Sequence, residues 1–275
     1  MKIRSLGYRT DLIFPRFDGE VVDRGDYTVI RTRSNPTFYW GNFLLFDQPP
    51  AAGDLHRWRR LFGEEIGVPP ATKHMAFGWD TTAGETGVIQ PFLDTGFRSN
   101  SSVVLTTREV SKPPKFNEQI EVRRVTKDRE WEGALEVQVA CCEPEDAAEG
   151  YRTFKRRQMA RWQAMTEAGL GEWFGAFVKD GIVENRIVGD LGVFVENGVG
   201  RFQSVGTHPD FRRLGICGTL VYEAARYAFE GMGAKTLVMV ADDDYHAAKI
   251  YEAVGFKPTE HQIGLTWWER EPHGN

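Results

Sequence analysis

The seven residues from Arg212 to Gly218 (Arg-Arg-Leu-Gly-Ile-Cys-Gly) restrict the fold more than any other stretch of the sequence. They hold two arginines and two glycines, and they lead directly into a segment whose apolar residues recur with the period of a helix. Glycines at a helix start let backbone N–H groups converge on a ligand, and the helix dipole adds about half a positive charge there. The sequence therefore predicts a phosphate-binding turn, whose arginines suit a diphosphate.

This turn matches neither of the two common nucleotide-binding patterns. The sequence contains no Gly-x-x-x-x-Gly-Lys-Ser/Thr loop, and no Gly-x-Gly-x-x-Gly follows a strand in a parallel βαβ unit. The turn instead follows two predicted hairpins, one around Asp180-Gly181 and the other around Asn197-Gly198. Both dipeptides supply the positive φ angles that tight hairpin turns need. We therefore expect the phosphate-binding turn directly after an antiparallel meander.

The other elements expected in the second half of the chain follow from apolar periodicity. They are a strand at 120–125, a helix over about 127–142 that Thr126 caps, a helix over about 146–168, a helix over about 215–231, a strand at 235–241, a helix that an aspartate at 243 or 244 caps, and a strand at 261–269. With the meander, the expected order is β, α, α, three antiparallel β, α, β, α, β.

A polar segment with paired prolines, residues 108–119, separates two stretches that each have the pattern of a complete domain. Clusters of proline among polar residues are typical of connections between folded segments. We therefore expect a first domain over residues 1–115 and a second domain over residues 116–275.

The two expected domains share an internal repeat. Residues 73–107 match residues 235–267 as strand, loop, helix, Gly-Phe and strand, with Gly-Phe at 96–97 and at 255–256. This repeat predicts that the two domains are related. The helix expected at 54–67 in the first domain has no glycine turn at its start, so we expect the first domain to lack the phosphate-binding turn.

Composition excludes several classes of protein. Apolar residues make up 41% of the chain and aromatic residues 12%, which is enough for a large core, and the net charge of −5 disfavours general nucleic-acid binding. No stretch of about 18 apolar residues could cross a bilayer, and the start lacks the apolar run of a signal peptide, so we expect a cytoplasmic protein. The three cysteines and six histidines show no metal-binding spacing, so we expect reduced thiols and no metal.

Three motifs of the second half occur in an order that is typical of one protein family. The helix start reads Arg-x-x-Gly-x-Cys from Arg212 to Cys217, the segment before it reads Val-Gly-Thr-His-Pro-Asp-Phe-Arg, and a later helix reads Ala-Lys-Ile-Tyr-Glu-Ala-Val-Gly-Phe. With these motifs, residues 120–275 resemble the GNAT superfamily of acyl-CoA-dependent N-acyltransferases, whose signature is Arg/Gln-x-x-Gly-x-Gly/Ala. The resemblance implies an α+β fold with a mixed, mostly antiparallel central sheet flanked by helices. Through the repeat, the first half resembles the degenerate partner in tandem members of the superfamily.

The resemblance also implies which residues bind acetyl-CoA. The backbone at 205–207 would pair with the pantetheine amides, and the N–H groups of 213–218 would hold the diphosphate. The implied cofactor-binding residues are Val205, Gly206, Thr207, Arg212, Arg213, Leu214, Gly215, Ile216, Cys217, Gly218, Thr219 and Asp244.

Tyr251 is the implied catalytic residue, because a phenol with an ordinary pKa of about 10 can protonate a departing thiolate. Two positions depart from the pattern of the family. Asp244 stands where many members carry asparagine, and an aspartate can cap the helix but has no amide to donate. Cys217 stands where glycine or alanine is usual, and we expect only its backbone N–H to be used. The alternative is a reactive thiol, whose pKa the helix start and the arginines would lower.

The resemblance predicts an N-acetyltransferase that moves an acetyl group from acetyl-CoA to a primary amine of a small molecule or peptide. Attack would be direct, in a ternary complex, without a metal. Two alternatives stay open, namely a non-catalytic module that binds or senses acyl-CoA and a transferase that uses a longer acyl donor. Asp190, Glu196 and Glu260 are candidate general bases, and none is assigned. We expect no nucleic-acid or membrane partner, and a homodimer is left open.

Overall fold

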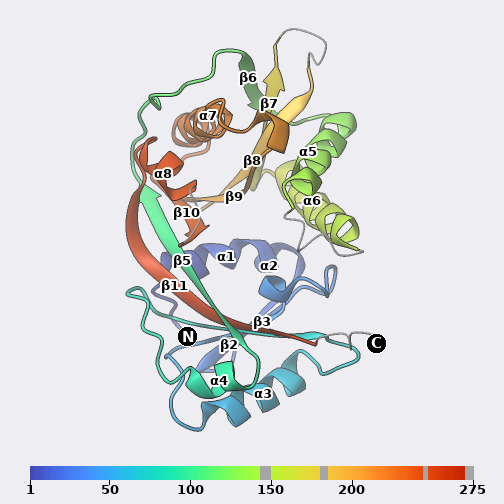
Figure 1. The fold of residues 1–275 in the computed structure, drawn as a ribbon, viewed down its shortest axis with the longest axis vertical. Coiled ribbons are helices and arrows are strands. Elements are labelled where there is room, and N and C mark those ends of the chain that lie inside the picture. The colour runs from blue at the N-terminus through green and yellow to red at the C-terminus, as the bar shows by residue number, and fades with distance from the viewer. Residues whose placement is uncertain (143–149, 180–184, 244–246, 270–275) are drawn as a thin grey trace. The chain divides into compact units, whose positions relative to one another are not determined.

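The computed structural model describes residues 1–142, 150–179, 185–243 and 247–269 (Figure 1). The chain forms two compact units, which we call unit 1 and unit 2. Unit 1 comprises Met1–Val104 together with the residues from Thr259 onward, and unit 2 comprises Leu105–Pro258. Segment 108–119, where we expected the domain boundary, lies wholly within unit 2.

Unit 2 has the expected mixed, mostly antiparallel sheet. Its strands lie in the order β10-β9-β8-β7-β6, and only the β9–β10 pair of this set is parallel. The strands are β6 (Ile120–Arg124), β7 (Gly171–Val178), β8 (Ile187–Glu196), β9 (Val199–Thr207) and β10 (Thr236–Asp242). The strands expected at 120–125 and 235–241 are therefore confirmed, with ends that differ by one residue.

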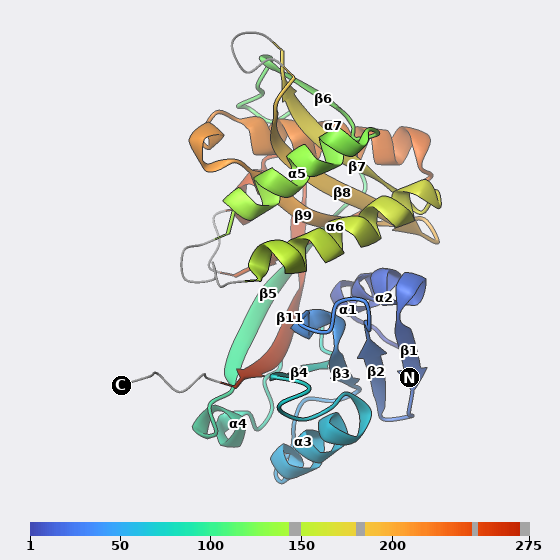
Figure 2. The same ribbon diagram turned by 90° about the vertical axis from the view of Figure 1, so that its right-hand side faces the viewer.

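Helices cover both faces of the sheet in unit 2. Two of them, α5 and α6, lie on one face, and α7 lies on the other (Figures 1 and 2). The helices of this unit are α5 (Asp128–Ala140), α6 (Tyr151–Glu167), the short 3₁₀ helix η3 (Pro209–Phe211), α7 (Ile216–Gly231) and α8 (Ala247–Glu252). The helices expected over 127–142 and 215–231 are confirmed. The hairpin turn predicted at Asp180-Gly181 and the cap predicted at Asp244 lie outside the described residues.

Local sequence explains two element ends in unit 2. The predicted hairpin at Asn197-Gly198 is confirmed, since these residues join β8 to β9 with φ angles of 52° and 77°. The prediction that Thr126 caps α5 is wrong, because Lys127 occupies the N-cap position. The carboxylate of Glu130 reaches back and accepts the N–H groups of Thr126 (3.0 Å) and Lys127 (3.2 Å).

Unit 1 also has strands of mixed direction, with helices on both faces. Its strand order is β1-β2-β3-β4-β11-β5, in which β3–β4 is parallel and β1–β2, β2–β3 and β4–β11 are antiparallel. The elements are α1 (Leu6–Asp11), α2 (Ile13–Asp18), β1 (Glu20–Asp23), β2 (Tyr27–Arg31), the 3₁₀ helix η1 (Tyr39–Gly41), β3 (Phe43–Phe46), α3 (Asp54–Glu65), β4 (His74–Trp79), α4 (Gln90–Asp94), β5 (Arg98–Thr107) and β11 (Lys257–Trp268). Strand β11 begins four residues before the strand predicted at 261–269.

The strands of unit 1 alternate between two apolar layers. On one face, the indole of Trp58 in α3 stacks on Phe46 with ring centroids 3.8 Å apart and an interplanar angle of 4°. On the other face, Tyr8 and Leu12 pack against Phe43 and other residues of the sheet. Because successive residues of a strand point to opposite faces, β3 supplies side chains to both layers.

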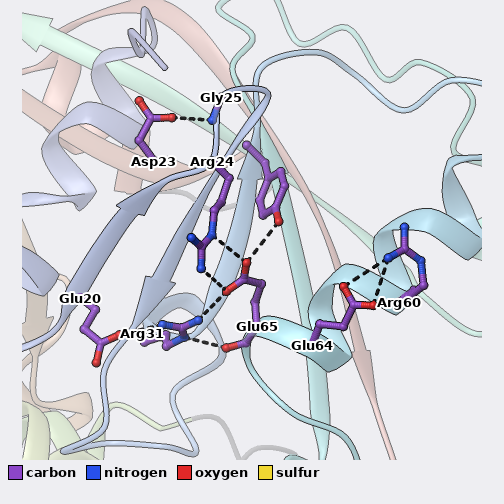
Figure 3. A network of polar contacts seen from close by, with 9 residues as sticks. Glu20, Asp23, Arg24, Gly25, Arg31, Arg60, Glu64 and Glu65 are labelled. Carbon is purple, nitrogen blue, oxygen red and sulfur yellow. Dashed lines mark hydrogen bonds and ion pairs between the residues drawn. The ribbon is translucent and has the colours of Figure 1, made fainter.

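An ion-pair network holds the carboxyl end of α3 against β1 and β2 in unit 1 (Figure 3). The carboxylate of Glu65 accepts hydrogen bonds from Arg24 (2.8 Å), Arg31 (2.6 Å) and the Tyr27 hydroxyl (3.2 Å). These bonds, that from Arg24 foremost, lower the pKa of Glu65. The network therefore contributes to the stability of unit 1 when the carboxylate is ionised.

The two copies of the sequence repeat share backbone details. Glycines 96 and 255 both end a helix with positive φ, 91° and 114°, and each is followed by phenylalanine. The N–H of Phe97 donates to the carbonyl of Phe92 at 3.1 Å, and the N–H of Phe256 donates to the carbonyl of Tyr251 at the same distance. Phe92 in the first copy therefore corresponds to Tyr251 in the second.

The prediction that the helix at 54–67 has no glycine turn at its start is wrong. Gly53 is the N-cap of α3 and has a φ angle of 91°, much as Gly215 is the N-cap of α7 with a φ angle of 81°. The sequence comparison missed Gly53 because no arginines or second glycine accompany it.

Candidate functional site

The phosphate-binding turn predicted at 212–218 joins η3 to α7 in unit 2. Arg213 has a φ angle of 63°, and Gly215 is the N-cap with a φ angle of 81°. In the described part of the chain, the backbone N–H groups from Arg213 to Gly218 donate to no protein acceptor. The first N–H groups of a helix have no partner within the helix, and the dipole makes this end positive. The turn therefore presents six consecutive donors at a positive helix end.

The arginines of the turn differ in their contacts. Arg212 donates weakly from Nε to the carbonyl of Thr207 at the end of β9, at 3.4 Å. Arg213 is exposed, and its guanidinium makes no hydrogen bond or ion pair with any residue that the structure describes. Arg213 can therefore bind an anion at the turn without breaking an existing ion pair.

Of the other predicted residues in this stretch, Leu214 is exposed at the tip, whereas Ile216 and Thr219 are 2% exposed. The hydroxyl of Thr219 donates to the carbonyl of Gly215 at 2.9 Å. Thr219 therefore supports the turn from within.

Cys217 is half-buried in the first turn of α7. Burial raises the pKa of its thiol to about 12. The alternative of a thiol whose pKa is lowered by the helix start and the arginines is therefore wrong. The thiol stays protonated near neutral pH, and only the backbone N–H of Cys217 is suited to anion binding.

Strand β9 separates from β10 beside this turn. It pairs with β8 from Val199 to Thr207, but it pairs with β10 only from Val199 to Arg201. Beyond Arg201, the edge of β9 that faces away from β8 has no partner strand within the described residues. The predicted positions 205–207 lie on this open edge, where backbone groups are available to pair with an extended ligand.

A bulge distorts β9 where its edge is open. The register with β8 shifts between Asp190, which lies opposite Gly206, and Gly192, which lies opposite Gln203, so β9 has one extra residue there. Ser204 has a φ angle of 48°, and its carbonyl accepts a hydrogen bond from Nε2 of Gln138 in α5 at 2.8 Å. The amide of Gln138 therefore fixes the bulge.

Asp190 is fully buried behind this bulge. Its carboxylate accepts one hydrogen bond from Gln138 (2.9 Å) and one from the indole N–H of Trp173 (3.0 Å). Burial raises the pKa of Asp190 to about 7, although both hydrogen bonds and the positive charge of Lys155 lower it. A Cβ on Gly206 would lie 2.9 Å from the Gln138 amide nitrogen and 3.1 Å from the Asp190 carboxylate. Only glycine fits at 206 without displacing this network.

The two other carboxylates considered as bases lie elsewhere. Glu260 belongs to unit 1, where it accepts hydrogen bonds from the Leu6 N–H (2.7 Å) and the Ser5 hydroxyl (3.2 Å) at the start of α1. Glu196 ends β8 opposite Val199, at the hairpin end of β9. Of the three candidates, only Asp190 lies beside the open part of β9.

Tyr251 lies in α8 and is 5% exposed. Its ring stands edge-on to Phe256 with centroids 6.5 Å apart, and Phe256 stands edge-on to Phe202 of β9 at 5.7 Å. The tyrosine is therefore connected by aromatic contacts to the strand whose edge is open.

The described residues offer neither a cluster of metal ligands nor a membrane-spanning helix. Among the described residues, no group of three or more His, Cys, Asp or Glu side chains is arranged to hold a metal ion. Within the same residues, every helix is too short or too polar to span a bilayer.

Comparisons with known proteins agree with this geometry. Residues 131–256 match the model of the acetyltransferase (GNAT) family. A functionally unknown conserved protein from Staphylococcus epidermidis has a similar fold, with a TM-score of 0.67, 14% identity and coverage of 95% of this chain and 100% of that one. No curated protein matches the sequence.

Two other similar structures carry GNAT names. A GCN5-related N-acetyltransferase from Kribbella flavida has a TM-score of 0.64 and 16% identity, covering 98% of this chain and 97% of its own. A tandem GNAT protein from the clavulanic acid biosynthesis pathway has a TM-score of 0.56 and 11% identity, covering 95% of this chain and 88% of its own. At these identities the likeness is one of fold, and that fold supports acyl transfer in general. Together with the family match, it shows that residues 131–256 form a domain of the GNAT acetyltransferase family.

Proposed function

We propose that this chain is an N-acetyltransferase that moves an acetyl group from acetyl-CoA to a primary amine of a small molecule or peptide, by direct attack in a ternary complex. The observation that carries the proposal is the separation of β9 from β10 beside a turn with six free N–H donors. An open strand edge and an anion-binding helix start are the two features needed for a ligand that has both amides and phosphates.

The residues present fit coenzyme A. The N–H groups of Arg213 to Gly218 and the guanidinium of Arg213 suit its diphosphate, because both supply donors and positive charge. The backbone of Val205, Gly206 and Thr207 suits the pantetheine amides, because it lies on the open edge. Asp244, which lies outside the described residues, remains a predicted contact from the sequence alone.

The chemistry follows from holding two reactants in line. The amine nitrogen attacks the thioester carbonyl carbon, the C–N bond forms, and the C–S bond then breaks. Backbone N–H groups polarise the carbonyl oxygen, and proximity lowers the barrier. Tyr251 gives its phenolic proton to the departing thiolate sulfur. Both oxygens of Asp190 are occupied by buried donors, so we assign it to holding β9, and the proton of the amine passes to water.

The proposal is tested by measuring thiol release from acetyl-CoA with a panel of primary amines that includes amino acids, peptides and polyamines. We expect release to require both the protein and an amine, and calorimetry to show acetyl-CoA binding without an amine. Binding without thiol release for any amine would favour the non-catalytic acyl-CoA-binding module. Faster thiol release from longer acyl-CoA thioesters than from acetyl-CoA would favour a transferase that uses a longer acyl donor. A protein that does not bind acyl-CoA at all would overturn the proposal.

We also propose that the chain is a tandem of related domains, with the expected division into 1–115 and 116–275. The shared backbone bonds around Gly96 and Gly255 support this relationship. The cytoplasmic location and the open question of a homodimer stay predictions.

A further inference from the structure

Segment 111–119, which precedes β6, packs against the phosphate-binding turn within unit 2. The N–H of Ser111 donates to the carbonyl of Val254 at 3.0 Å, and the ring of Pro113 lies 3.5 Å from where a Cβ on Gly218 would be. Phe116 stands edge-on to Tyr222 of α7, with centroids 6.1 Å apart. The segment is therefore part of the structure around the start of α7.

Three carbonyl groups of the turn are held by side chains. Lys115 donates from Nζ to the carbonyl of Arg213, and Asn117 donates from Nδ2 to the carbonyl of Leu214 at 2.8 Å. The Thr219 hydroxyl donates to the carbonyl of Gly215 at 2.9 Å and accepts the backbone N–H of Asn117 at 2.8 Å. Segment 111–119 thus supplies two of these side chains directly and fixes the third.

The orientation of the free N–H groups follows from these bonds. In a trans peptide, the N–H of one residue points opposite to the carbonyl of the residue before it. Holding the carbonyls of Arg213 and Leu214 toward segment 111–119 therefore turns the N–H groups of Leu214 and Gly215 away from it. Arg213 has a positive φ angle of 63°, which is unfavourable for a residue with a side chain, so the turn needs such support.

Asn117 is itself fixed in place. Its Oδ1 accepts the N–H of Gln119 at 2.8 Å, which orients the amide so that Nδ2 faces Leu214. Lys115 is exposed apart from its contact with the turn. Because both residues bond to the carbonyl side of the turn, neither is placed to touch an anion on the N–H side.

We propose that Asn117 is a positioning residue for the binding of the coenzyme A diphosphate. It acts by holding the carbonyl of Leu214, and Lys115 acts in the same way by holding the carbonyl of Arg213. This inference rests on the proposed function. It extends the binding site to a segment of the chain that contributes no ligand contact of its own.

The test is calorimetric titration of the full chain with coenzyme A and with pantetheine, which lacks the diphosphate. For Asn117→Ala we expect about tenfold weaker binding of coenzyme A, because one hydrogen bond that orients the turn is lost, and pantetheine affinity within twofold of wild type. Asn117→Asp keeps the acceptor for Gln119 but loses the donor to Leu214, so it should weaken coenzyme A binding at least as much. Lys115→Met should weaken it less, because the Lys115 side chain is exposed whereas Asn117 is half-buried.

Asn100→Ala is the matched control, since Asn100 donates to the Thr266 hydroxyl at 2.9 Å within unit 1 and should leave both affinities unchanged. Coenzyme A binding within twofold of wild type in both Asn117 variants and in Lys115→Met would overturn the inference alone. Equal losses for coenzyme A and pantetheine would also overturn it, because they indicate a general structural role. A wild-type protein that binds neither probe would overturn the proposed function and the inference with it.

Discussion

The helix starts at Gly53 in unit 1 and at Gly215 in unit 2 have similar backbone geometry but different surroundings. At α3, the first helical residue is Asp54, whose carboxylate accepts the N–H of Ala51 at 2.8 Å and places a negative charge at the helix start. At α7, the first turn has no acidic residue, and the N–H groups face no protein acceptor among the described residues. The difference teaches that the side chains around a helix start decide whether it is available to an outside anion.

The two units also differ in their parallel strand pairs and in the helices that carry Phe92 and Tyr251. In unit 1, β3 stays paired with β4 up to Phe46, whose carbonyl then accepts the N–H of Asp80 at 2.9 Å. In unit 2, β9 leaves β10 after Arg201. Phe92 occupies the position that Tyr251 has in the other copy of the repeat. Unit 1 thus keeps its strand pair closed and has a carboxylate at its helix start, whereas unit 2 has an open strand edge and no acidic residue in the first turn of α7.

The largest expected effect separates the two glycines. A Cβ on Gly215 would clash with the backbone carbonyl of Lys115, whereas a Cβ on Gly53 would meet nothing within 4 Å. We expect Gly215→Ala to lower the free energy of unfolding by about 3 kcal/mol and to weaken coenzyme A binding about 100-fold or more. Gly53→Ala should cost about 1–2 kcal/mol, the strain of a left-handed residue, without changing affinity. Urea unfolding measures the stability of both variants, and calorimetry measures their affinity for coenzyme A. Equal losses of affinity in Gly215→Ala and Gly53→Ala would contradict the difference between the two helix starts.

The next largest effect is expected at Tyr251 and at its counterpart in the repeat, Phe92. Tyr251→Phe should lower turnover about 100-fold through loss of the proton donor, with acetyl-CoA affinity within twofold of wild type. The control, Phe92→Tyr, adds a hydroxyl to a side chain that is 1% exposed and should lower stability but not turnover. Steady-state kinetics with the best amine of the panel checks both. Unchanged turnover in Tyr251→Phe would remove this phenol from the mechanism.

The smallest effect distinguishes one carboxylate in unit 2, Asp190, from one in unit 1, Glu65. Folding raises the pKa of Asp190 from 3.8 to about 7. Between pH 3.8 and about pH 7 the folded state therefore binds a proton that the unfolded state has lost. Its contribution to stability is therefore present at low pH and falls by about 2 kcal/mol as the pH rises from 5 to 7. Asp190→Asn should remove that fall, measured as the difference from wild type in urea unfolding.

Glu65 should show the opposite sign, because its pKa is lowered by Arg24 and its other partners. Its contribution is present above the pKa of the unfolded state and is lost as the pH falls below it. A Glu65→Gln variant should therefore differ from wild type near neutral pH and converge with it in acid. The same direction of change in the Asp190 and Glu65 variants would contradict the assignment.

Short-range features were predictable from the sequence. The hairpin at Asn197-Gly198 and the start of α7 at Gly215 depend on φ angles that glycine and asparagine supply locally. The position of the turn at 212–218 could be predicted for the same reason, and its binding of phosphate stays a prediction.

Features that depend on distant residues were not predictable. Asp190 stands between glycine and leucine in a stretch that reads as a surface or turn position, and its burial depends on Gln138, 52 residues away, and Trp173, 17 residues away. Asn117 lies in a segment that reads as a connection, and its bond to Leu214 spans 97 residues. Neither contact leaves a periodic pattern or a motif in the sequence.

The pairing of β11 with β4 also sets the order in which unit 1 can be completed at the ribosome. Gly264 lies opposite Gly78, which precedes it by 186 residues, and the Tyr8 hydroxyl donates to the Ile263 carbonyl 255 residues later at 2.6 Å. At a synthesis rate of about 5–20 residues per second, β4 waits roughly 10–40 seconds for this partner. During that time one edge of β4 is unpaired, so nascent chains that lack β11 should be the form of this protein most in need of chaperones.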